Sequence, residues 1–144
     1  MVETYTSSTT TDNFNTGYTA TSGTNFTLSG VNGATVGSGT DAKFGTTGYA
    51  SNGTTGIIFN DPQNQGAAFN GEVLVTNTQS TMTRLQFSYM DLQVQAKTLK
   101  LYAADGTVVG TYTIPLGAGN FDSGTVGTPF KYIGISGGTK DYWS

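Results

Sequence analysis

Residues 97–116, with the sequence KTLKLYAADGTVVGTYTIPL, are the segment that most constrains the fold. Apolar and polar side chains alternate on both sides of Asp105-Gly106, with Leu101 in the first run and Tyr112 in the second. Alternation is typical of a half-buried strand, and Asp-Gly between two such runs favours a two-residue type I′ turn. The segment therefore predicts a β-hairpin, and an antiparallel β fold follows from it.

The rest of the chain has similar short runs, separated by clusters of Gly, Asn, Asp and Ser. No segment keeps a helical period over three turns. Thr and aromatic residues favour pleated surfaces, while the 21 Gly and the many Asn supply turn positions. We therefore predict an all-β fold, a two-sheet antiparallel β-sandwich of jelly-roll-like type. The expected strands are 24–31, 41–45, 55–59, 66–77, 82–95, 97–104, 107–115, 129–136 and 140–144.

One expected strand changes phase along its length. In MTRLQFSYMDLQVQA, residues 82–96, the apolar set contains Phe87 and Tyr89 and then shifts to Met90 and Leu92. A strand of period two needs one extra residue for such a shift, so we predict a β-bulge near Tyr89–Asp91. A bulge of this kind bends the strand or re-aims a side chain at a functional rim; the bend is the favoured interpretation.

Length and charge limit the domain organisation and the partners. With 144 residues, the chain predicts one sandwich domain over 12–144, preceded by a flexible lead-in at 1–11. The net charge is −3 and the six Lys and Arg residues are scattered, so we expect no nucleic-acid partner. No apolar run approaches the length of a membrane span, which argues against membrane insertion. The isolated domain is expected to be a monomer.

The residue types that are missing exclude much catalytic chemistry. The chain has no Cys and no His, so thiolate or imidazole catalysis and His-ligated zinc are impossible. Paired carboxylates, as in a glycosidase, remain as an alternative, with Asp61, Glu72 and Asp91 as candidates. Glu72 is out of phase with Val73, which predicts a position on the solvent face. No spacing brings two of these carboxylates together, so we predict that the protein is not an enzyme.

Calcium binding is a more natural use of the oxygen-rich turns of this sequence than carboxylate catalysis. Asp and Asn side chains, together with backbone carbonyls, are hard ligands that Ca²⁺ prefers. Each cluster also has a simpler explanation as a turn in which Asn or Asp caps the backbone. None of the clusters has the spacing of an EF-hand loop or of a nonapeptide calcium repeat. The candidate clusters are Asp12, Asn13 and Asn15; Asn60 and Asp61; and Asn120 and Asp122.

Aromatic rings are the other resource for binding. A tyrosine ring offers an apolar face to sugar C–H groups and a hydroxyl to sugar oxygens. Most rings must fill the core, since Phe44, Phe59 and Phe87 alternate with polar neighbours. Tyr18 and Tyr49 lie in Gly- and Thr-rich segments and are expected to be exposed. The predicted ligand-binding residues are Tyr18, Tyr49, Asn52, Asn60 and Asp61.

The second half of the chain resembles a group of bacterial extracellular domains. The hairpin at 99–114, followed by FKYIGIS at 130–136 and a last strand from Asp141, is similar to β-sandwich domains of PEP-CTERM-type secreted proteins, jelly-roll carbohydrate-binding modules and large adhesins. The resemblance covers about residues 55–144. It implies an extracellular or cell-surface location, a two-sheet sandwich, and a structural Ca²⁺ where the first and last strands meet. On this sequence that site would use Asp12, Asn13, Asn15 and Asp141.

Composition, chemistry and resemblance together favour a binding module. The leading hypothesis is a non-enzymatic extracellular domain that recognises carbohydrate, or another cell-surface ligand, with support from Ca²⁺. A weakly charged, hydroxyl- and amide-rich surface suits neutral polymers. The alternative is a structural spacer or assembly domain of a surface protein with no ligand of its own.

Overall fold

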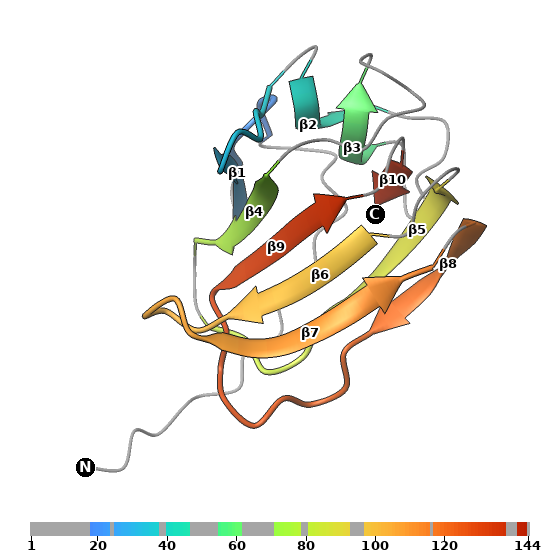
Figure 1. Cartoon of the computed structure of the whole chain (residues 1–144). Coiled ribbons are helices and arrows are strands. Elements are labelled where there is room, and N and C mark those ends of the chain that lie inside the picture. The colour runs from blue at the N-terminus through green and yellow to red at the C-terminus, as the bar shows by residue number, and fades with distance from the viewer. Residues whose placement is uncertain are drawn as a thin grey trace.

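The computed structural model describes residues 18–23, 25–37, 40–46, 55–61, 71–78, 81–92, 97–115, 117–137 and 141–143. These residues form ten strands in two antiparallel five-stranded sheets (Figure 1). Sheet A has the order β1-β4-β9-β6-β7 and sheet B the order β2-β3-β10-β5-β8. The strand bounds are β1 Phe26–Val31, β2 Thr40–Thr46, β3 Thr55–Asp61, β4 Glu72–Asn77, β5 Gln86–Leu92, β6 Lys97–Tyr102, β7 Val108–Ile114, β8 Gly117–Asp122, β9 Tyr132–Gly137 and β10 Asp141–Trp143.

The connections between the strands have jelly-roll topology. Strands β3 to β10 form one four-stranded block in each sheet, β4-β9-β6-β7 and β3-β10-β5-β8, and the chain crosses between the sheets repeatedly as it winds through them. This is the order of an eight-stranded jelly roll with two Greek keys. The remaining strands, β1 and β2, extend the two sheets next to β4 and β3. The predicted all-β, jelly-roll-like sandwich is confirmed.

Strict alternation explains why the two sheets pack together. In β4 and β6 every second side chain is buried, and the apolar ones share one hydrophobic cluster with Ile133 and Ile135 of β9 and with aromatic residues of sheet B. Phe59 in β3 and Phe130 before β9 are fully buried, so the core runs through the whole sandwich. Burying such rings supplies the main favourable term in folding. The inward side chains of sheet A include Val73, Val75, Leu99, Leu101, Ile133 and Ile135.

The hairpin of 97–116 forms, but its turn differs from the predicted type I′. Among the described non-glycine residues only Asn32 has a positive φ, so Asp105 keeps a negative one. Gly106 has a φ of 88°, and its N–H donates to the Ala103 carbonyl at 2.9 Å. This is a type I turn followed by a left-handed glycine, the three-residue form of hairpin. The prediction of a type I′ turn was wrong because the three-residue loop needs only one positive φ, which Gly106 supplies, whereas type I′ needs two.

Strand β8, Gly117–Asp122, was not predicted from the sequence. Its composition, GAGNFD, is poor in the residues that favour strands. The strand exists because it pairs with β5 along the edge of sheet B, where Gly119 lies directly beneath the ring of Tyr89. The register between β5 and β8 shifts between Tyr89 and Leu92, which confirms the predicted bulge. Tertiary pairing here outweighs local propensity.

Candidate functional site

The outer face of sheet A gathers polar and aromatic side chains from three neighbouring strands. Strand β9 lies between β4 and β6, so residues that alternate away from the core come together across these strands (Figure 1). Tyr132 is directly opposite Tyr102, and Gly134 is opposite both Leu74 and Lys100. Residues directly opposite each other on one face have Cβ atoms about 5 Å apart. We call the surface formed by Glu72, Leu74, Lys100, Tyr102 and Tyr132 around Gly134 the tyrosine face.

The centre of the tyrosine face is a bare glycine bridged by two side chains. Tyr102 and Glu72 stand on the strands flanking β9, and the Tyr102 hydroxyl donates to the Glu72 carboxylate, at 2.9 Å from Oε1 and 2.7 Å from Oε2. Their contact passes over Gly134: a Cβ added there would lie 2.6 Å from Glu72 Cδ and 2.7 Å from Tyr102 Cε2. Such distances are far below van der Waals contact. Only a residue without a side chain lets this pair form.

The contact with Glu72 changes the pKa of Tyr102. Partial burial, the hydrogen bond to Glu72 and the negative charge of that carboxylate, in this order, raise the pKa of Tyr102 to about 12. A phenol normally titrates near pH 10. The Tyr102 hydroxyl is therefore protonated at neutral pH and donates the hydrogen bond that fixes the position of the Glu72 carboxylate.

The Glu72 carboxylate keeps room for a ligand. Both oxygens share a single donor, the Tyr102 hydroxyl, among the residues that the structure describes. A carboxylate offers about four acceptor positions. The remaining positions can accept hydroxyl groups from outside, and the half-buried Tyr132 lies opposite Tyr102 on the same face. The arrangement can therefore hold a polar ligand that has both hydroxyl and C–H surfaces.

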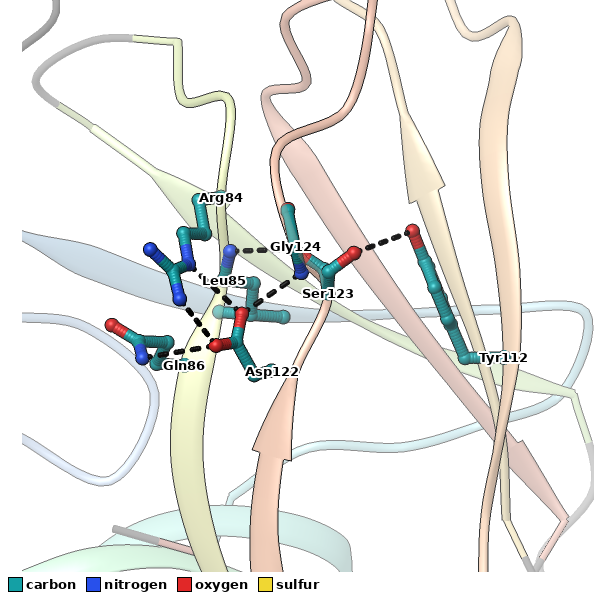
Figure 2. Close-up of polar contacts among 7 residues, drawn as sticks. All are labelled: Arg84, Leu85, Gln86, Tyr112, Asp122, Ser123 and Gly124. Carbon is teal, nitrogen blue, oxygen red and sulfur yellow. Dashed lines mark hydrogen bonds and ion pairs between the residues drawn. The ribbon is translucent and has the colours of Figure 1, made fainter.

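A second polar group, the Arg84–Asp122 cluster, lies at the end of the β5–β8 pair and has no such room (Figure 2). Arg84 donates to Asp122 through Nε at 2.9 Å and through Nη2 at 2.5 Å. The Gln86 side-chain amide at 3.2 Å and the backbone N–H of Gly124 at 2.8 Å complete the set. All four acceptor positions of the carboxylate are filled. The Arg84 guanidinium and these hydrogen bonds hold the pKa of Asp122 well below its usual range.

The Arg84–Asp122 cluster therefore acts as a clamp on the scaffold. Next to it, Ser123 accepts from the Leu85 N–H through Oγ at 2.8 Å, and the Tyr112 hydroxyl points at the Ser123 carbonyl at 3.5 Å (Figure 2). Tyr112 also packs edge-on against Phe121, with ring centroids 5.3 Å apart. These contacts tie the end of β8 to β5 and β7. For the predicted Asn120 and Asp122 cluster, the capping explanation holds, since Asp122 caps Gly124.

The loop tyrosines predicted to bind ligand are placed only in part. Tyr18 was expected to be exposed, but this was wrong: it is half-buried, with its ring 4.6 Å from that of Phe44 and over Gly23. Its hydroxyl accepts the Asn25 N–H at 3.4 Å. The Tyr18 ring is partly buried because it packs against Phe44 and because Gly23, which has no side chain, leaves space for it. Tyr49 and Asn52 lie outside the described residues, and of Asn60 and Asp61 only the backbone, at the end of β3, is described.

The predicted calcium ligands are placed even less completely. Asp12, Asn13 and Asn15 lie outside the described residues, and Asp141 is placed by its backbone at the start of β10, opposite Phe59. Strand β10 pairs with β3 and β5, whereas β1 belongs to the other sheet. Within the described ranges, no three Asp, Glu, His or Cys residues gather as a metal site would require. The same ranges contain no helix that is long and apolar enough to cross a membrane.

Sequence reasoning missed most of the tyrosine face. It put Glu72 on the solvent side, which the structure confirms, but it did not single out Tyr102, Tyr132 or Lys100 as binding residues. Their signal was present, because each is out of phase with the buried residues of its strand. What was missing was the strand order, which places β9 between two strands far away in sequence.

Comparisons with known proteins give a structural likeness without a family. No protein-family model matches the sequence, and no curated protein matches it. Two solved structures of variants of CBM29-2, a family 29 carbohydrate-binding module, are similar to this chain, each with 14% identity and a TM-score of 0.44. The alignments cover 82% of this chain and 84% of the first structure, and 83% and 87% for the second. At this level no residue or ligand of those modules is transferred to this chain.

Proposed function

We propose that this protein is a non-catalytic carbohydrate-binding module and that the tyrosine face is its binding surface. The observation that carries the proposal is the Glu72 carboxylate, held over Gly134 by the Tyr102 hydroxyl with acceptor positions to spare. A saccharide offers adjacent hydroxyls that donate to a carboxylate and C–H faces that pack on tyrosine rings. Tyr132, opposite Tyr102 on the same face, supplies such a ring.

The proposed setting is a secreted or cell-surface protein of bacterial origin, such as an adhesin. Support comes from the resemblance of residues 55–144 to extracellular sandwich domains. In the same proposal Ca²⁺ stabilises the segments around Asp12, Asn13, Asn15 and Asp141. Its role would be to order the loops and not to contact the sugar.

A structural spacer remains the second candidate, and one observation favours it. That hypothesis expects the loop tyrosines to be buried or dispersed, and Tyr18 is indeed packed against Phe44. A spacer, however, has no need for a carboxylate with open acceptor positions on a sheet face. Carbohydrate binding therefore remains the preferred proposal.

A panel of soluble polysaccharides, tested by affinity electrophoresis in Ca²⁺ and again in EDTA, examines the proposal. We expect binding to at least one polysaccharide, weakened about fivefold by Tyr132→Ala or Tyr102→Ala, since a ring contact contributes about 1 kcal/mol. Ser88→Ala, on the outer side of sheet B, is the control and should bind like the wild type. Failure of the folded protein to bind any polysaccharide in either buffer would leave the spacer as the better account.

A further inference from the structure

The tyrosine face carries a fixed negative charge without a cationic partner. Among the described residues no Lys or Arg nitrogen lies within 4.0 Å of the Glu72 carboxylate, and its hydrogen-bonding partner is the neutral Tyr102. Two of the described cations are engaged elsewhere: Arg84 pairs with Asp122, and Lys97 lies in the core with its Nζ 5.0 Å over the ring of Phe59, whereas Lys100 lies on the tyrosine face itself. Glu72 therefore has no ion-pair partner among the described residues.

The position of that charge is set by the backbone. Because Gly134 has no side chain, the Glu72 carboxylate can lie directly over the backbone of β9. The hydrogen bond from Tyr102 on β6 holds the carboxylate, and the backbone of Glu72 is held in β4 by its pairing with β9. The charge also acts on Tyr102, whose pKa it helps to raise together with partial burial and the hydrogen bond.

We propose that Glu72 makes the face selective for neutral saccharides over acidic ones; this inference rests on the proposed carbohydrate-binding function. A neutral sugar presents hydroxyl donors to the free acceptor positions of Glu72. A uronate presents a second carboxylate, which is repelled at close range and has no proton to donate. Discrimination comes from the like-charge contact, not from a better fit to the neutral sugar.

Lys100 is the residue that argues for the opposite outcome. It lies beside Gly134 in the register and carries a positive charge on the same face. Its flexible stem allows the ammonium to stay in water, whereas the Glu72 carboxylate is fixed by Tyr102. The repulsion of an acidic sugar by the fixed Glu72 carboxylate is therefore expected to exceed its attraction to the mobile, hydrated Lys100 ammonium. If Lys100 dominated instead, the face would prefer acidic sugars.

The test uses a matched pair of ligands. The neutral polysaccharide that binds the wild type best is compared with the same polymer after oxidation of its primary alcohols to carboxylates, by calorimetry at about 20 and 150 mM salt. We expect the wild type to bind the oxidised polymer at least about tenfold more weakly, with a smaller ratio at the higher salt concentration because salt screens the repulsion. Glu72→Gln keeps the shape of the side chain and should reduce the ratio to less than about threefold.

The control is Asp105→Asn, which changes the net charge by the same amount at the hairpin tip. Its carbonyl can still accept the Thr107 N–H, as the Asp105 carboxylate does at 2.9 Å, so the turn is kept. This variant should retain the wild-type ratio. Equal or tighter binding of the oxidised polymer by the wild type, or an unchanged ratio in Glu72→Gln, overturns the selectivity even though carbohydrate binding itself stands. No binding to any neutral polysaccharide overturns both.

Discussion

Replacing Gly134 with Ala tests the geometry of the tyrosine face most sharply. The added Cβ would lie 2.6 Å from Glu72 Cδ and 2.7 Å from Tyr102 Cε2, so the two side chains must separate. The lost hydrogen bond to a charged group is worth about 1.5–3 kcal/mol, and partial exposure places it at the lower end. Ala in a strand recovers about 0.5–1 kcal/mol relative to Gly. The net expectation is a destabilisation of about 1 kcal/mol.

Urea unfolding of Gly134→Ala measures this difference. The control is Gly127→Ala, where an added Cβ meets nothing within 4 Å and the substitution should be neutral or slightly stabilising. Tyr102→Phe should remove the same hydrogen bond, so combining it with Gly134→Ala should cost clearly less than the sum of the two changes. A Gly134→Ala variant as stable as Gly127→Ala would refute the contact over Gly134.

Three further perturbations follow from the same structure. The pKa of Tyr102 is raised to about 12 against about 10 in an unfolded chain, so its contribution to the free energy of unfolding should be complete below pH 10 and be lost between about pH 10 and 12. In a plot of urea midpoint against pH, Tyr102→Phe should flatten this part of the curve. An unchanged slope contradicts the assignment to Tyr102. Because the pKa of Asp122 is lowered, its contribution is present above about pH 4 and is lost as the pH falls below it; Asp122→Asn should show a shallower acid loss in the same assay, and an equally steep loss would exclude Asp122 as the source. Gly119→Ala places a Cβ 2.9 Å from the Tyr89 hydroxyl oxygen. Because Tyr89 is buried, thermal unfolding should show that the free energy of unfolding falls by about 1–3 kcal/mol. A variant as stable as the wild type would mean that Tyr89 moves freely.

The class of fold was accessible from the sequence because alternation is a local signal. The runs around Leu101 and Tyr112 and the phase shift near Tyr89 correctly predicted a hairpin and a bulge. Strand β8 was missed because GAGNFD has no strand-forming preference of its own and is held by its pairing with β5. The type I′ turn was wrong because Asp-Gly fits two turn geometries, and the sequence alone does not choose between them.

The candidate site was harder to predict for a different reason. Glu72, Tyr102 and Gly134 come from three strands, and the distance from Glu72 to Gly134 along the chain gives no hint that they touch. The loop residues looked more promising because Gly- and Thr-rich surroundings suggest exposure, yet Tyr18 packs on Phe44. Local composition describes a segment, whereas the tyrosine face is a product of strand order.

The most direct measurement of the central claim is a titration of the ¹⁵N-labelled protein with a neutral oligosaccharide, followed by NMR. The account predicts that the amide signals which move belong to β4, β9 and β6, with Glu72, Tyr102, Tyr132 and Gly134 among the largest shifts. Movement confined to the loops around Tyr18 or residues 49–61 would contradict the tyrosine face as the binding surface. Signals that stay in place across a panel of neutral sugars would contradict carbohydrate binding altogether.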